Sequence, residues 1–108
     1  MQIQVNTDRN ITGHADMIAQ VQVVVENALS RFSAHITRVE VHLSDENSDK
    51  KSGVNDMRCV MEARLERRKP VAVTEHATTV EQAVEGAAHK LARLVESARG
   101  REHDKSSR

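Results

Sequence analysis

The sequence predicts an α+β domain in which a four-stranded sheet carries two helices on one face, in the chain order β-α-β-β-β-α. Several short segments alternate apolar and polar residues, as half-buried strands do, and two longer segments repeat apolar residues every three to four positions, as amphipathic helices do. With 108 residues, the chain has room for one core and not for two. One-sided strands require both helices on the same face of the sheet, which leaves the opposite face polar.

The first strand and the first helix are predicted in the first third of the chain. Residues 2–6 alternate, with Ile3 and Val5 on one side. Residues 13–32 change to helical spacing and predict a helix with one apolar face. That face consists of Ile18, Val21, Val25, Ala28, Leu29 and Phe32.

Three further strands are predicted between residues 36 and 77. Residues 36–44 alternate, and residues 45–55 are polar without a pattern, which predicts a loop. A short break at residues 67–70 separates the last two strands, so these should pair as a hairpin. The inward row of the first of these strands is Val39, Val41 and Leu43; that of the second is Cys59, Met61, Ala63 and Leu65; that of the third is Val71, Val73 and Glu75.

The second helix is predicted to begin at a threonine. Either Thr78 with Glu81 or Thr79 with Gln82 fits a capping box, in which the two side chains satisfy free amides of the first turn. The helical pattern continues to Gly100. Its apolar face is predicted to consist of Val80, Val84, Ala87, Leu91, Leu94, Val95 and Ala98.

The composition argues for one domain over residues 1–99 and a disordered, charged tail over residues 100–108. No stretch approaches the roughly 18 apolar residues of a membrane span, and the start lacks signal-peptide features, so a cytoplasmic protein with no membrane partner is expected. Cys59 is the only cysteine and is expected to be a buried structural residue. Zinc-site spacings, phosphate loops and nucleophile elbows are absent, so we expect no enzyme, no metal, no cofactor and no small-molecule substrate.

The charge is unevenly distributed although 16 Lys and Arg balance 16 Asp and Glu. Residues 1–46 carry three arginines against six acids, a net charge of −3, so the rest of the chain carries +3. Its basic residues include Arg64, Arg67, Arg68 and Lys69 at one hairpin end and Lys90, Arg93, Arg99 and Arg101 along the second helix.

Two interpretations of these basic residues stay open. Lys and Arg could contact phosphates through charge and bidentate geometry. Alternatively, they could form a solvated, salt-bridged surface, because Glu62, Glu66 and Glu96 lie among them. Phe32 is the only aromatic residue, so any RNA contact should be to the backbone and not through base stacking.

Three segments resemble the ribosome hibernation promoting factor and ribosome-associated inhibitor family, also labelled sigma-54 modulation protein. These are MQIQVNTDRNI at the start, FSAHITRVEVHLSDEN after the first helix, and HKLARLVES in the second helix. The likeness runs from Met1 to about Ser97, and the chain resembles the short form of the family. It implies the same β-α-β-β-β-α order, similar to double-stranded RNA-binding domains.

The resemblance implies a translation inhibitor that binds rRNA of the small ribosomal subunit (30S), as a monomer, and blocks the messenger and tRNA channel. The basic K-L-x-R pattern of the family falls on Lys90 and Arg93, which would contact phosphates together with Arg99 and the hairpin. The first helix of the family usually has several cations, where this sequence has only Arg31. The alternative is a protein-interaction or regulatory module that keeps the family fold without tight ribosome binding.

Overall fold

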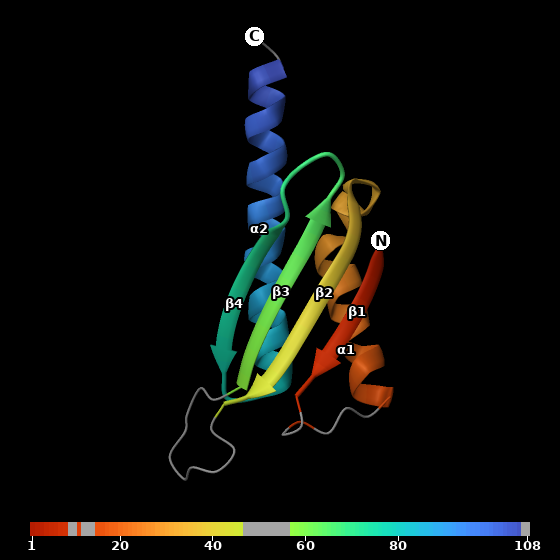
Figure 1. Ribbon diagram of the computed structural model, residues 1–108, viewed down its shortest axis with the longest axis vertical. Helices are drawn as coiled ribbons and strands as arrows, with labels where there is room; N and C mark the ends of the chain where they lie inside the picture. The colour runs from red at the N-terminus through yellow and green to blue at the C-terminus, as the bar shows by residue number, and fades with distance from the viewer. Residues whose placement is uncertain (9–10, 12–14, 47–56, 107–108) are drawn as a thin grey trace.

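The chain forms a four-stranded sheet with both helices on one face (Figure 1). The structure is a computed structural model that describes residues 1–8, 11, 15–46 and 57–106, with side chains up to Arg99. Its elements are β1 (Gln2–Thr7), α1 (Ala15–Leu29), the 3-10 helix η1 (Ser30–His35), β2 (Ile36–Asp45), β3 (Met57–Leu65), β4 (Val71–Ala77) and α2 (Val80–Ser106). The predicted fold class and element order are confirmed. Most of the loop predicted at residues 45–55 lies outside the described residues.

The strands lie in the order β1-β2-β3-β4. β1 runs parallel to β2, and the other two pairs are antiparallel, so β3 and β4 form the predicted hairpin. The register aligns Val5, Val41, Met61 and Val73 across all four strands. Because side chains alternate along a strand, this register puts every apolar row on the face that the helices cover.

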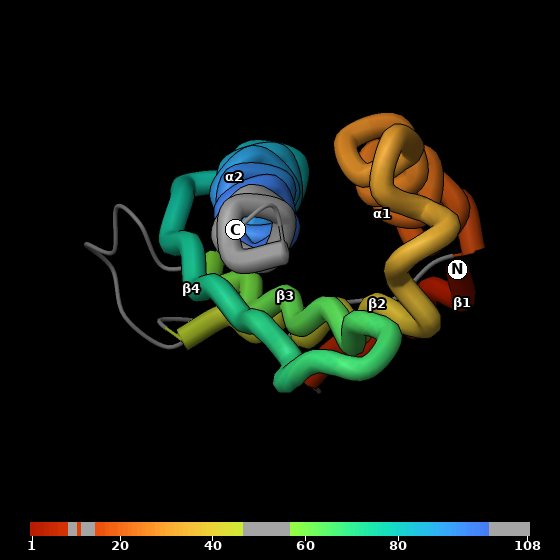
Figure 2. Tube along the Cα trace, turned by 90° about the horizontal axis from the view of Figure 1, so that it is seen from above, coloured from red at the N-terminus to blue at the C-terminus, as the bar shows by residue number. Residues whose placement is uncertain are grey.

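Both helices lie over one face of the sheet (Figure 2), and the largely aliphatic core lies between them and the strands. Removing such side chains from water supplies most of the favourable free energy of folding. The inward rows of β2 and β3 are buried as predicted, together with Val21, Val25, Leu29 and Phe32 of the first helical segment and Val84, Ala87, Leu91 and Val95 of α2.

One residue of the predicted apolar face of α2 is placed wrongly. Leu94 is 41% exposed, whereas Leu91 and Val95 are fully buried. Leu94 precedes Val95 by one residue and is therefore turned about 100° away from it around the helix, at the margin of the buried stripe.

The first helical segment ends as a 3-10 helix, where its periodicity predicts a continuous α-helix. The α-helix stops at Leu29, and η1 carries the chain on to His35. Phe32 nevertheless stays buried, at 4% exposure, because the 3-10 turns keep its ring against the core. The predicted start at residues 13–14 lies outside the described residues.

The structure decides between the two caps of the second helix. The backbone amide of Gln82 donates to Oγ1 of Thr79 at 3.1 Å, so Thr79 is the N-cap and α2 begins at Val80. Thr78 instead donates its hydroxyl to the side-chain oxygen of Gln82 at 2.7 Å.

The end predicted for this helix at Gly100 is wrong, since α2 continues to Ser106. Gly100 is helical in the chain and costs only about 1 kcal/mol relative to Ala, too little to stop a helix by itself. The division into a domain over residues 1–99 and a separate tail stays a prediction.

Candidate functional site

Six basic residues from four separate segments gather at one end of the sheet, the end that holds η1 and the β3–β4 turn (Figure 1). This basic end consists of Arg31, Arg64, Arg67, Arg68, Lys69 and Arg99. The segments are joined by direct contacts. The amide of Glu66 donates to the carbonyl of His35 at 3.0 Å, and a small cavity of about 20 Å³ is lined by His35, Arg68 and Arg99 together.

The β3–β4 turn presents its cations to solvent. The amide of Arg68 donates to the carbonyl of Leu65 at 3.4 Å, which closes a four-residue turn. Arg67, the third residue of this turn, has a φ of 62°. A non-glycine residue in this left-handed region costs roughly 1–2 kcal/mol. Arg67 and Lys69 are both exposed, so the turn holds two charges outward at a position that glycine would occupy with less strain.

Two arginines lie over the only aromatic ring of the protein. The guanidinium of Arg31 is 4.8 Å from the ring centroid of Phe32, and that of Arg99 is 5.8 Å from it. Cation–π contacts of this kind hold the two side chains near each other. Arg31 also pairs with Glu96 at 3.6 Å, both side chains being largely exposed. Because the ring is buried beneath these groups, it is not available to stack on a base.

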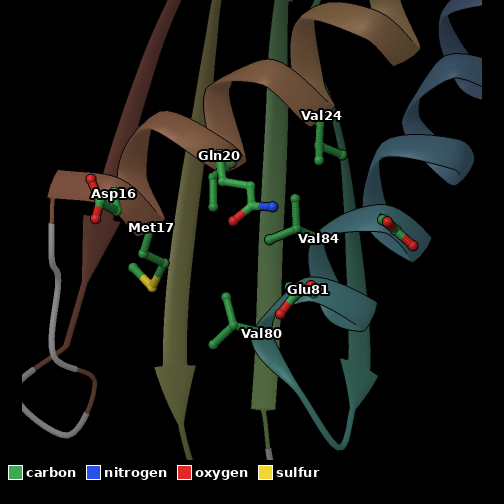
Figure 3. Close-up of a pocket in the computed structure, with 9 residues that line it drawn as sticks. Asp16, Met17, Gln20, Val24, Val80, Glu81 and Val84 are labelled. Carbon is green, nitrogen blue, oxygen red and sulfur yellow. The ribbon is translucent and has the colours of Figure 1, made fainter.

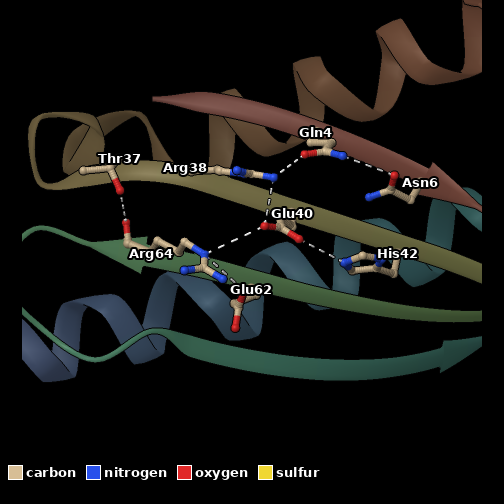
Figure 4. A network of polar contacts seen from close by, with 8 residues as sticks. All are labelled: Gln4, Asn6, Thr37, Arg38, Glu40, His42, Glu62 and Arg64. Atoms are coloured by element: carbon tan, nitrogen blue, oxygen red, sulfur yellow. Dashed lines mark hydrogen bonds and ion pairs between the residues drawn. The ribbon is translucent and has the colours of Figure 1, made fainter.

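Arg64 belongs to a balanced network on the polar face of the sheet (Figure 4). Its Nε lies 3.8 Å from Glu40 and 3.6 Å from Glu62. Glu40 also pairs with Arg38 at 3.1 Å and with His42 at 3.4 Å. The charge of Arg64 is therefore largely compensated, whereas Arg67 and Lys69 of the turn have no ion-pair partner among the described residues.

The structure separates the cations that the sequence grouped along α2. Lys90 faces the edge strand β4, where its Nζ lies 2.5 Å from Oε1 of Glu75 and donates to the carbonyl of Thr74 at 3.2 Å. Arg99 lies on the other side of the helix, against η1. Arg93 is exposed and has no ion-pair partner within the described part of the chain. Lys90 therefore does not join the basic end.

A glycine makes room for the contact between β4 and α2. A Cβ added at Gly86 would lie 2.5 Å from Oε2 of Glu75 and 2.8 Å from its Cγ. The predicted inward position of Glu75 is thus possible because the helix has no side chain opposite it. Lys90 then neutralises the carboxylate at the edge of the core.

Sequence reasoning missed Arg38 as a neighbour of the basic end. Arg38 pairs with Arg64 in the β2–β3 register and hydrogen-bonds to Gln4. The polar row of β2 showed that Arg38 faces solvent, but only the strand register shows which end of the sheet it occupies.

Cys59 is fully buried, as predicted. Burial, with a smaller contribution from the charge of Glu75, raises the pKa of the Cys59 thiol to about 12. The thiol is therefore neutral at physiological pH and unsuited to act as a nucleophile. Across the described ranges, no helix is both long and apolar enough to cross a membrane.

Comparison with known proteins gives matches in family and in fold. Residues 7–103 match the family described as Sigma 54 modulation protein / S30EA ribosomal protein. The fold is similar to the Protein Y N-terminal domain of Thermus thermophilus, at a TM-score of 0.64 and 21% identity, covering 90% of this chain and 98% of that one. It is also similar to a ribosomal subunit interface protein from Coxiella burnetii, at a TM-score of 0.62 and 12% identity, covering 93% and 99%. No curated protein sequence matches.

Proposed function

Because the chain belongs to the Sigma 54 modulation protein / S30EA ribosomal protein family, we propose that it is a ribosome-associated hibernation factor. It binds rRNA of the small subunit (30S) as a cytoplasmic monomer and blocks the messenger and tRNA channel by occupying it. The description of the similar Coxiella burnetii structure as a ribosomal subunit interface protein supports this proposal. The mechanism is steric and requires neither a chemical step nor a cofactor.

The observation that carries the proposal is the basic end. Its cations come from segments that are distant in sequence and adjacent in the fold, so together they can follow the path of a phosphate backbone. Burial of Phe32 leaves contact to phosphates and shape as the mode of recognition. The left-handed Arg67 fits this role, because local backbone strain is often retained where a side chain has a function.

Co-sedimentation with small ribosomal subunits at several salt concentrations tests the proposal. The unmodified protein should pellet at low salt and be released steeply as salt rises, because bound phosphates give up counterions. An Arg67→Gln, Lys69→Gln variant should bind more weakly and reduce the slope of log affinity against log salt by about two. Arg58→Gln is the matched control, since Arg58 lies at the start of β3, away from the basic end, and pairs with Glu46 at 3.5 Å. Equal pelleting of all three proteins would contradict the residue assignment.

A single substitution separates binding from folding. Arg67→Gly removes a cation and relieves the left-handed backbone, so the variant should be about 1 kcal/mol more stable and yet bind the subunit more weakly. Unfolding by urea gives the first quantity and co-sedimentation the second. If binding rises together with stability, Arg67 does not contact RNA.

The two cations of the family pattern in α2 should not contribute equally. Both side chains are exposed, but Lys90 would have to leave Glu75 to reach a phosphate, whereas Arg93 has no ion-pair partner among the described residues. Arg93→Gln should therefore weaken co-sedimentation more than Lys90→Gln does. The opposite order would mean that Lys90 exchanges its partner on binding.

The network on the polar sheet face favours a second candidate, a protein-interaction module. Glu40 and its partners form a surface of both signs that suits a protein of mixed charge better than a polyanion (Figure 4). Such a contact should change little with salt, in contrast to the RNA contact. Failure to pellet with small subunits even at low salt would favour this second function.

A further inference from the structure

An apolar groove runs between α1 and α2 (Figure 3). Met17 and Val24 of α1 and Val80 and Val84 of α2 line a hollow of about 490 Å³. An adjoining hollow of about 680 Å³ shares Val24 and Glu85 with it and continues along the same pair of helices. Both volumes fall in the range of ligand-binding clefts.

Acidic side chains are concentrated at one end of the groove. Asp16, Glu81 and Glu85 line the first hollow, and none of the described residues that line it is basic. Glu85 also lines the second hollow, together with Arg31 and His89. No ion pair joins any of the three carboxylates to another described residue, although Glu40, Glu75 and Glu96 elsewhere are all paired. The acidic half of the groove is thus an uncompensated negative surface around apolar side chains.

Interaction with the helix dipoles explains the position of only some of these acids. Asp16 and Glu81 lie in first helical turns, where acids are favourable. Glu85 lies one turn further along α2, and the dipole does not explain the apolar lining between the acids. The combination of apolar floor and acidic rim calls for an occupant that has an apolar ridge and positive flanks.

We propose that this interhelical groove binds a basic amphipathic helix of a partner protein. An apolar ridge would fill the space between Met17, Val24 and Val80, and Lys or Arg side chains would pair with the acidic rim. RNA does not fit, because the three carboxylates repel phosphates. In a two-fold contact, a second copy of this chain would offer the same concave surface with the same carboxylates, and two such surfaces neither fill nor neutralise each other. The proposal does not depend on rRNA binding by the basic end.

Binding of a labelled helical peptide of Leu, Ala and Lys, about 18 residues long, tests the groove by fluorescence anisotropy. The same peptide with Glu in place of Lys should not bind. Glu81→Gln with Glu85→Gln should weaken binding of the Lys peptide roughly 2- to 30-fold, as expected for two exposed ion pairs. The matched control removes two exposed carboxylates outside the groove, Glu26→Gln with Glu66→Gln, and should change affinity by less than about 2-fold.

A second pair of variants tests the apolar lining. Val24→Asn should weaken binding of the Lys peptide. Val23→Asn should not, because Val23 is 52% exposed and does not line the groove. Circular dichroism melts identify any variant that fails to fold, and the carboxylate pair then decides alone. Absence of binding, equal binding of both peptides, equal effects of variants and controls, or a self-association that Val24→Asn abolishes would each overturn the proposal. Because the probe is a peptide, failure here leaves the ribosome test unaffected.

Discussion

Gly86→Ala should not give this protein the stability that it gives an exposed helix, although alanine is the better helix former. In an exposed helix interior this substitution stabilises by about 1 kcal/mol. Here the new Cβ would lie 2.5 Å from Oε2, 2.7 Å from Cδ and 2.8 Å from Cγ of Glu75. Three atoms of one side chain are thus too close, so Glu75 must rotate away from the helix.

The cost follows from what Glu75 loses when it rotates. Leaving its rotamer costs about 0.5–1.5 kcal/mol. Its ion pair with Lys90 at 2.5 Å is partly exposed, and such a pair contributes about 0.2–1 kcal/mol. Set against the gain of about 1 kcal/mol from helix propensity, the net result ranges from a gain of about 0.3 kcal/mol to a loss of about 1.5 kcal/mol.

A double-mutant cycle isolates this contact. In a Glu75→Ala background the obstacle is gone, and Gly86→Ala should stabilise by about 1 kcal/mol, which is a rise in Tm of about 4–8 °C. Circular dichroism at the helix band is the suitable probe, because the chain has no Trp or Tyr. The coupling between the two positions should be about 1–2 kcal/mol. Equal stabilisation by Gly86→Ala in both backgrounds would refute the reasoning.

Three further predictions concern single positions. Leu91→Ala should cost about 2–5 kcal/mol and Leu94→Ala less than about 1 kcal/mol, because only Leu91 is fully buried; equal costs in urea unfolding would contradict the exposure of Leu94. The Cys59 thiol ionises near pH 9.0 when unfolded and about 12 when folded, so above pH 9 the unfolded chain loses the proton first and stability falls. Between about pH 8 and pH 10 the loss should be about 1.4 kcal/mol relative to Cys59→Ala, and parallel pH profiles of the two proteins would show that the thiol is not shielded. Thr79→Ala removes the N-cap of α2 and should lower stability by about 1 kcal/mol, whereas Thr78→Ala should cost less; the reverse order would place the cap at Thr78.

The fold was predictable from sequence because periodicity reports directly which side of an element meets the core. The inward row of β3 from Cys59 to Leu65 alternates without a break, and each member is buried. The same reasoning failed for Leu94, since a periodic pattern does not say how wide a stripe of the helix surface the sheet covers. It also failed at Gly100, where a helix-breaking residue met a segment that otherwise continues the helix.

The sequence predicted which residue types belong to the candidate site, but not which of them lie together. Arg67 and Lys69 were correctly expected at a hairpin end, because that depends on a short link between neighbouring strands. Whether Lys90 or Arg99 would join them depends on the rotation of α2 against the sheet and η1. Both are cations of one helix, yet one contacts β4 and the other lies over Phe32.

The sequence by itself determined the element order, the buried rows, the shielded Cys59 and the resemblance that the family match confirms. These features depend on the spacing of residues that are close together in the sequence, so the sequence is enough to predict them. Only the tertiary structure decided the strand order, the meeting of Arg31, Arg68 and Arg99, and the acidic groove between the helices. Each of these joins segments far apart in the chain, and their contact depends on packing geometry that no local pattern encodes.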